Sequence, residues 1–179
     1  MTTALRRVCV TGPESTGKTT LAQRLAEYAH TEWVPEASRL YAERKGSALL
    51  VSDVEPIARE HIALADAAAE KARARKAPVL VLDTDLLSTM IYSRYYYDTV
   101  APWLGRTEQA RRADLYLLCD IDVPWIPDGV RDRPANRDEM FALFRDALAN
   151  TGASFATVRG DWDERWTLAR AAFDAVVAR

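Results

Sequence analysis

The chain has little of what marks several classes of protein. It has two cysteines among 179 residues, Cys9 and Cys119. Both fall in predicted core strands without the spacing of metal ligands, so we expect buried, reduced thiols. No apolar run approaches a membrane span, and the segment before the first apolar run is too short for a signal peptide. We therefore expect a cytoplasmic protein with no membrane insertion. The formal net charge of −2 gives no electrostatic reason to expect a nucleic-acid partner.

The chain does have the composition of one folded domain. Hydrophobic residues make up 49% of it, which argues against disorder. Its 179 residues are enough to bury a full core. We see no internal repeat and no linker long enough to divide it, so we expect a single domain over residues 1–179.

Apolar patterning predicts strands and helices in alternation. Runs that are apolar throughout, as in strands buried on both faces, occur at 79–82 and 114–119. Alternation of this kind implies an α/β fold with a five-stranded parallel sheet covered on both faces. Strands are predicted at 5–11, 31–34, 79–82, 114–119 and 154–158, and helical segments at 17–30, 38–41, 52–76, 85–97, 103–112, 138–150 and beyond 161.

Two of these helices carry more detailed expectations. The helix from 52 opens with a predicted capping box, Ser52-Asp53-Val54-Glu55. The last helix is expected to bury one apolar stripe, made of Trp162, Trp166, Ala169, Phe173 and Val176.

The most informative motif is Gly12-Pro13-Glu14-Ser15-Thr16-Gly17-Lys18-Thr19, which matches the phosphate-binding loop G-x-x-x-x-G-K-[ST]. Its glycines let the backbone wrap phosphate oxygens, and its amides and the following helix N-terminus face the anion. Lys18 is expected to reach the β- and γ-phosphates and the Thr19 hydroxyl to bind Mg²⁺. The flanking apolar run and amphipathic stretch favour this interpretation over an ordinary turn. The expected ATP-binding residues are Gly12, Glu14, Ser15, Thr16, Gly17, Lys18, Thr19 and Thr20.

Polar residues at strand ends are the next candidates, because parallel sheets bind ligands beyond the carboxyl ends of their strands. Glu36 and Arg39 follow the second predicted strand, and could hold a polar substrate or form a surface ion pair. The third strand ends in Asp83-Thr84-Asp85. Asp83 is expected to hold Mg²⁺ through water or to accept a proton from an attacking hydroxyl. Asp85 is expected to contact the substrate, to cap the following helix, or both.

Adjacent aromatic residues occur at 92–97. Neighbouring positions on a helix cannot all face one core, so at least one ring should line a cleft or the surface. Such a ring could stack on a flat, electron-poor ligand, although routine packing is the alternative for each. The candidates for stacking are Tyr95, Tyr96 and Trp103.

The segment 124–137 is rich in proline, arginine and aspartate and is predicted to be a lid. Its guanidinium groups would neutralise a transferring phosphoryl group, with Arg131 catalytic and Arg133 at the nucleotide. A solvated loop with local Asp–Arg pairs is the alternative. After the last strand, Arg159-Gly160-Asp161 is a further candidate for the edge of an adenine pocket, whereas His61 is expected to pack or lie at the surface.

Several of these motifs together resemble the ribosylnicotinamide kinase domain, the C-terminal part of multifunctional NAD-biosynthesis regulator proteins. The resemblance rests on the phosphate-binding loop, Pro35-Glu36-Ala37-Ser38-Arg39, Asp83-Thr84-Asp85, Asp122-Val123-Pro124-Trp125 and Asp128-Gly129-Val130-Arg131, in that order over nearly the whole chain.

The resemblance implies a P-loop fold of the nucleoside-monophosphate-kinase type. It also implies ATP- and Mg²⁺-dependent phosphorylation of the ribose 5′-hydroxyl of nicotinamide riboside, giving nicotinamide mononucleotide. Lys18, Asp83 and Arg131 would be catalytic, and Glu36 and Arg39 would contact the ribose side of the acceptor. Repressor and adenylyltransferase functions of the multidomain proteins are not implied, because only seven residues precede Val8.

Two alternatives stay open. One is a kinase of another nucleoside or nucleotide, such as a deoxynucleoside monophosphate, whose phosphate Arg39 and Arg94 could bind. The other is an ATP-binding regulatory module with little turnover. The residues do not indicate an oligomeric state.

Overall fold

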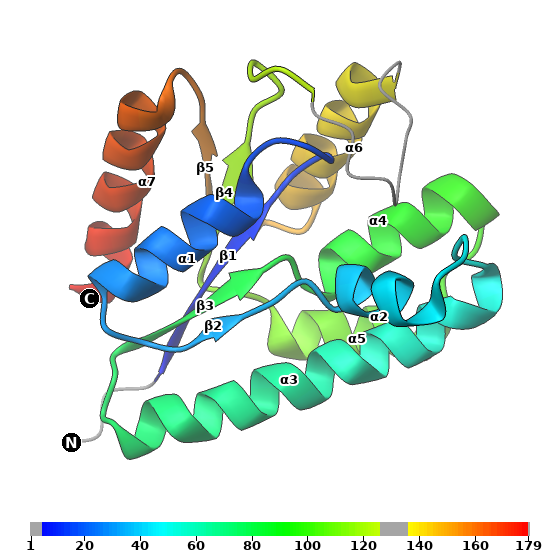
Figure 1. Ribbon diagram of the computed structural model, residues 1–179, viewed down its shortest axis with the longest axis horizontal. Coiled ribbons are helices and arrows are strands. Elements are labelled where there is room, and N and C mark those ends of the chain that lie inside the picture. The colour runs from blue at the N-terminus through cyan, green and yellow to red at the C-terminus, as the bar shows by residue number, and fades with distance from the viewer. Residues whose placement is uncertain (1–4, 126–135, 179) are drawn as a thin grey trace.

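The computed structural model describes residues 5–125 and 136–178. Its strands form one parallel sheet in the order β2-β3-β1-β4-β5, with the helices packed on both sides (Figure 1). The predicted α/β class and five-stranded parallel sheet are therefore confirmed. The strands are β1 (Arg6–Thr11), β2 (Trp33–Val34), β3 (Val79–Asp83), β4 (Leu115–Cys119) and β5 (Phe155–Val158).

The helices follow the strands in alternation. They are α1 (Lys18–Tyr28), α2 (Ala37–Lys45), the short 3-10 helix η1 (Val51–Asp53), α3 (Val54–Ala74), α4 (Leu86–Tyr97), α5 (Pro102–Arg111), α6 (Arg137–Asn150) and α7 (Trp162–Val177).

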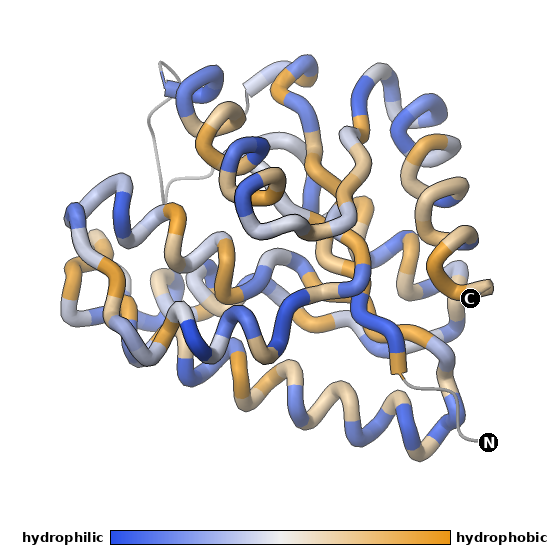
Figure 2. The backbone as a smooth tube through the Cα atoms, turned by 180° about the vertical axis from the view of Figure 1, so that it is seen from behind, coloured by the Kyte–Doolittle hydropathy of each residue, from blue (hydrophilic) through white to orange (hydrophobic). Residues whose placement is uncertain are grey.

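The core lies in two layers, one on each face of the sheet. Successive strand residues point to opposite faces, so Val8 and Val10 pack with α1 and α7 while Cys9 between them packs toward α3 and α6. Figure 2 shows the result as hydrophobic strands inside and helices that alternate between hydrophobic and hydrophilic residues. Cys9 and Cys119 are both buried free thiols, as predicted. Among the described residues, no helix combines the length and apolarity that crossing a membrane requires.

Two local predictions are wrong. Ser52 does not open a capping box. Instead the Asp53 carboxylate accepts the Leu50 backbone N–H at 2.7 Å, because a 3-10 turn precedes α3. Trp162 does not join the buried stripe of α7, since 51% of it is exposed. It is the first helical residue after the cap Asp161, and its ring lies against Gly17.

The lid predicted at about 124–137 falls largely outside the described residues and stays a prediction. The assignment of residues 1–179 to a single domain also stays a prediction. The described part begins α6 at Arg137, one residue before the predicted helix start.

Candidate active site

The phosphate-binding loop lies between β1 and α1, and hydrogen bonds within the loop hold its shape. Gly12 and Gly17 have φ of 130° and 77°, values that side chains disfavour. A Cβ on Gly12 would also lie 2.8 Å from the Cys119 carbonyl oxygen, so glycine is required there twice over. The Thr16 hydroxyl and the Lys18 ammonium both donate to the Pro13 carbonyl, at 2.9 and 2.6 Å.

Asp83, at the end of β3, faces this loop. Its Oδ2 accepts the Thr19 hydroxyl at 2.6 Å. Its Oδ1 is buried with no hydrogen-bond partner among the described residues. Burial, and then the nearby Glu36, raise the pKa of Asp83 to about 6, against the opposing effects of Thr19, Lys18 and Arg39. The carboxylate is therefore ionised at neutral pH but can still take up a proton.

Asp85, two residues on, faces the opposite way and supports α4. Its Oδ1 accepts the Leu87 N–H at 3.0 Å as a helix cap, and its Oδ2 accepts the Tyr116 hydroxyl at 2.6 Å. Thr84 between the two aspartates has a φ of 65°, which is uncommon for a β-branched residue. This conformation turns the two carboxylates apart, one toward the loop and one into the protein.

Because Asp85 is buried, its bond to Tyr116 should contribute to stability. Tyr116→Phe would leave Oδ2 without that donor and should cost about 1–3 kcal/mol of unfolding free energy, the cost of a buried group left unsatisfied. Urea unfolding measures this. The matched control is Tyr28→Phe, because the Tyr28 hydroxyl bonds Asp174 at 3.3 Å in an exposed site and should change stability by less than about 0.5 kcal/mol. Equal effects of the two variants would contradict the assigned support role.

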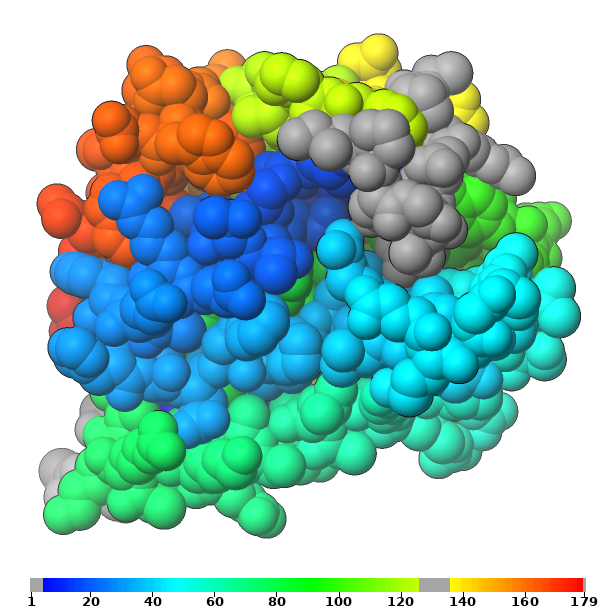
Figure 3. All heavy atoms as spheres, in the orientation of Figure 1, coloured from blue at the N-terminus to red at the C-terminus, as the bar shows by residue number. Residues whose placement is uncertain are grey.

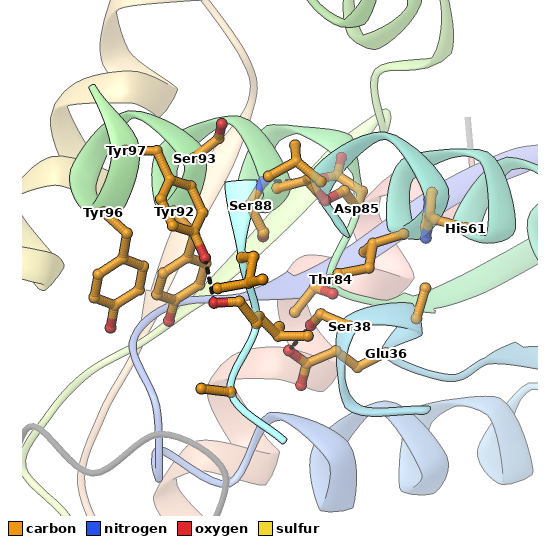
Figure 4. Close-up of a pocket in the computed structure, with 17 residues that line it drawn as sticks. Glu36, Ser38, His61, Thr84, Asp85, Ser88, Tyr92, Ser93, Tyr96 and Tyr97 are labelled. Carbon is orange, nitrogen blue, oxygen red and sulfur yellow. Dashed lines mark hydrogen bonds between the residues drawn. The ribbon is translucent and has the colours of Figure 1, made fainter. Parts of the chain in front are cut away.

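A cavity of about 350 Å³ opens beside these strand ends. Figure 4 shows Glu36 and Ser38 on one side of it and the tyrosines of α4 on another. The Ser38 hydroxyl donates to Glu36 Oε1 at 2.7 Å, and the rings of Tyr92 and Tyr96 are stacked at 6.0 Å. The described residues that line it include two carboxylates but no lysine or arginine. They are Glu36, Ala37, Ser38, Ala48, Leu49, Leu50, Val54, Ile57, His61, Thr84, Asp85, Ser88, Thr89, Tyr92, Ser93, Tyr96 and Tyr97.

The structure brings some predicted aromatic residues to this cavity and leaves others away from it. Tyr96 lines it, whereas Tyr95 lies beside Glu14 in a small neighbouring pocket and donates to Glu139 at 3.1 Å. Trp103 is absent from the lining and instead lies under the Arg59 guanidinium, 4.9 Å from it.

The charged and hydroxyl residues predicted for the site lie in different places. Arg39 is near enough to Asp83 to lower its pKa, and Thr20 is exposed on the first turn of α1. Arg131 and Arg133 lie outside the described residues.

Arg137, the last arginine of the predicted lid segment, lies at the start of α6 and donates to the Ser15 carbonyl at 3.4 Å. Other residues of the site were not among the expected ones. Arg165 of α7 is only 1% exposed and donates to the Thr16 carbonyl at 3.1 Å, so it anchors the phosphate-binding loop to α7. His61 lines the cavity although no role was expected for it. Arg165 stands among charged neighbours in the sequence, so its pattern is that of a solvated helix face.

Comparisons with known proteins agree with this geometry. A family model described as an AAA domain matches residues 7–165. The trifunctional NAD biosynthesis/regulator protein NadR of Escherichia coli (strain K12) is 30% identical over 169 residues, which cover 90% of this chain and 40% of NadR. The chain therefore spans about two fifths of that curated relative. The predicted resemblance to NAD-biosynthesis regulator proteins is confirmed.

Solved structures give the same result. A NadR protein in complex with NR has a TM-score of 0.82 at 26% identity, covering 98% of this chain and 52% of that one. NadR in complex with NAD and AMP-PNP has a TM-score of 0.75 at 25% identity, with 98% and 50% covered. A thymidylate kinase from Ehrlichia chaffeensis matches at 0.61 and 15% identity, over 93% and 97% of the two chains. That last likeness concerns the fold alone, which is of the nucleoside-monophosphate-kinase type as predicted.

Proposed function

This chain belongs to the AAA domain family, and we propose that it is an ATP-dependent small-molecule kinase. Its acceptor is nicotinamide riboside, which it phosphorylates at the ribose 5′-hydroxyl to give nicotinamide mononucleotide. The NadR complexes with NR, the abbreviation of nicotinamide riboside, and with the ATP analogue AMP-PNP support both halves of the proposal.

The position of Asp83 carries the proposal. One of its oxygens bonds Thr19 of the phosphate-binding loop. The residue after it in the chain, Thr84, and the carboxylate that perturbs it, Glu36, both line the cavity. A hydroxyl of an acceptor in that cavity would therefore meet the donor's terminal phosphate at Asp83.

Each residue has a defined part in the transfer. The acceptor oxygen forms a bond to the γ-phosphorus, the bond from that phosphorus to the β–γ bridging oxygen breaks, and ADP leaves. Asp83 takes the proton of the attacking hydroxyl, for which a pKa of about 6 is close to the optimum for a base at neutral pH. Lys18, which bonds Pro13 in the loop, is expected to turn to the phosphates and neutralise their charge. We further propose that the Arg131 guanidinium stabilises the negative charge on the transferring group and that Arg133 binds the nucleotide.

Mg²⁺ fits the residues present. Asp83 Oδ1, which has no hydrogen-bond partner among the described residues, and the Thr19 hydroxyl are hard oxygen donors of the kind that this ion prefers. These two residues would hold it beside the phosphates, where it supplies charge neutralisation.

The cavity favours a nucleoside over a nucleotide as acceptor. Its described lining includes the Glu36 carboxylate and no cationic side chain, so the described lining itself offers no counter-charge to an acceptor phosphate. Arg94, proposed for a monophosphate acceptor, is exposed on α4 and is not in that lining. The pyridinium of nicotinamide riboside is cationic, and a cation is attracted both to carboxylates and to the faces of tyrosine rings.

The test is transfer from γ-labelled ATP to a panel of acceptors. Nicotinamide riboside should be used with a kcat/KM at least about a hundredfold above that of thymidine monophosphate, since an uncompensated charge in a fitted pocket is strongly rejected. Cytidine and thiamine serve as neutral and cationic controls. Transfer to the monophosphate with none to nicotinamide riboside would instead favour a nucleotide kinase, and nucleotide binding without transfer to any acceptor would favour a regulatory module.

A further inference from the structure

His61 is a buried histidine on the wall of the large cavity, and its ring forms no hydrogen bond in the described part of the chain. It lies on α3 and is only 5% exposed. Figure 4 shows it at the opposite end of the lining from Tyr96. The outer wall comes from α2 and the loop after it, which form the cyan surface in Figure 3. His61 therefore faces a space that is enclosed by several elements.

Most other polar side chains of this cavity already bond within the protein. These bonds join Ser38 to Glu36, Ser88 to Thr11, Ser93 to the Thr99 carbonyl, Tyr97 to the Leu49 carbonyl, and Asp85 to Tyr116 and the Leu87 N–H. Buried polar groups in proteins nearly always have a partner. The imidazole of His61 is thus a polar group of the wall that a ligand in the cavity can bond.

This imidazole is neutral at neutral pH. Burial, and then the nearby Arg111 and Arg7, lower the pKa of His61 to about 4, against an opposing effect of Asp66. The two arginines line a small neighbouring pocket with His61 and are absent from the lining of the large cavity. A neutral imidazole has one N–H donor and one nitrogen acceptor, and it does not repel a cationic acceptor.

The acceptor group that would meet His61 belongs to the base. Transfer needs the 5′-hydroxyl at Asp83, and Glu36 is close enough to Asp83 to raise its pKa, so the ribose would lie beside Glu36. The base would then extend between α3 and α4, whose residues form much of the remaining lining. The carboxamide on the pyridinium ring has a carbonyl acceptor and an NH₂ donor. Both match what a neutral imidazole offers.

We propose that His61 determines acceptor specificity by a hydrogen bond between its imidazole and the carboxamide of the acceptor's base. The proposal rests on the proposed function, because it needs nicotinamide riboside in the cavity. One net hydrogen bond typically changes an affinity by about 2- to 12-fold. An effect of this size can be measured when the two groups are removed separately and together.

Two acceptors that differ only in the carboxamide test this proposal. They are nicotinamide riboside and the riboside of unsubstituted pyridine, which keeps the cationic ring and the ribose. The wild-type kcat/KM should be about five- to tenfold higher for nicotinamide riboside. His61→Ala should lose about that factor with nicotinamide riboside and should no longer distinguish the two acceptors. His61→Gln, whose amide can also donate and accept, should keep part of the preference.

Ile57→Ala is the matched control. Ile57 lies one helical turn before His61, is also 5% exposed and lines the same cavity. Its truncation opens space but removes no hydrogen-bonding group, so kcat/KM should fall by the same factor for both acceptors and the preference should remain. Thermal unfolding shows whether each variant is folded at the assay temperature.

Two results would overturn the role of His61 and leave the kinase proposal intact. One is a wild type that uses both ribosides equally well, which requires no variant. The other is a folded His61→Ala that keeps the wild-type preference, whether its activity is normal or falls equally for both acceptors. A wild type that transfers phosphate to neither riboside would overturn both proposals together.

Discussion

Asp83→Asn should reduce kcat by about a hundredfold or more while ATP binding persists. Asparagine keeps the shape and an oxygen for the Thr19 hydroxyl, but it cannot accept the proton of the attacking alcohol, a step typically worth 10²–10⁴-fold. Steady-state transfer from labelled ATP to nicotinamide riboside measures kcat, and calorimetry measures nucleotide affinity. The matched control is Asp146→Asn, an exposed carboxylate of α6, which should behave as the wild type does.

The pH profile checks the same assignment. A base must be ionised, so the wild-type kcat/KM should fall as the pH drops toward the pKa of Asp83. Burial and Glu36 raise this pKa to about 6 in the metal-free protein, and bound Mg²⁺ would lower it. The residual activity of Asp83→Asn should lack this limb.

The stability of Asp83→Asn should show that its lower kcat is not caused by unfolding. Because the pKa of Asp83 is raised on folding, the folded state binds its proton more tightly than the unfolded chain does. The stability that this proton contributes is present at low pH and disappears as the pH rises through about 6. At pH 7 the buried charge is a cost, so Asp83→Asn should have a Tm at or above that of the wild type. Near-normal turnover in this stable variant would remove Asp83 from the role of base.

Lys18→Ala should reduce kcat by about 10²–10³-fold and also weaken ATP binding. Lys18 is only 8% exposed, and its ammonium is already held against the loop at the Pro13 carbonyl. It therefore needs only a local rearrangement to reach the phosphates. Removal of one preorganised electrostatic group from a transition state usually costs this much.

Lys71→Ala is the control for Lys18→Ala. Lys71 is an exposed lysine on α3, and its substitution removes the same charge from the protein. It should leave both kcat and the calorimetric titration with ATP and Mg²⁺ unchanged. Catalysis that survives in Lys18→Ala, or a wild type that gives no heat with ATP and Mg²⁺, would contradict the proposed use of the loop.

The type and order of the elements could be predicted because each has a strong local signal. The continuously apolar run at 79–82 requires burial on both faces, and the glycine spacing of the loop has few conformations that fit it. The strand-end rule then placed Glu36, Asp83 and Asp85 near one another. Ser52 failed as a cap because the 3-10 turn at 51–53 depends on how the chain enters α3.

Contacts made across the fold were not predictable in this way. Tyr95, Tyr96 and Trp103 have similar local signals, yet only Tyr96 lines the cavity, because the facing of each ring is set by the packing of α4, α5 and α6. Arg165 is buried only because four carbonyl and carboxylate groups from three separate segments converge on its guanidinium.

The amino-acid sequence by itself determined that the chain forms a phosphate-binding loop on a parallel sheet, since glycines at fixed spacing and apolar periodicity act through the local backbone. Only the tertiary structure decided which carboxylate faces that loop, which tyrosines line the cavity and that Trp162 lies on Gly17. These depend on side chains that are far apart in the sequence and meet only when the strands and helices pack.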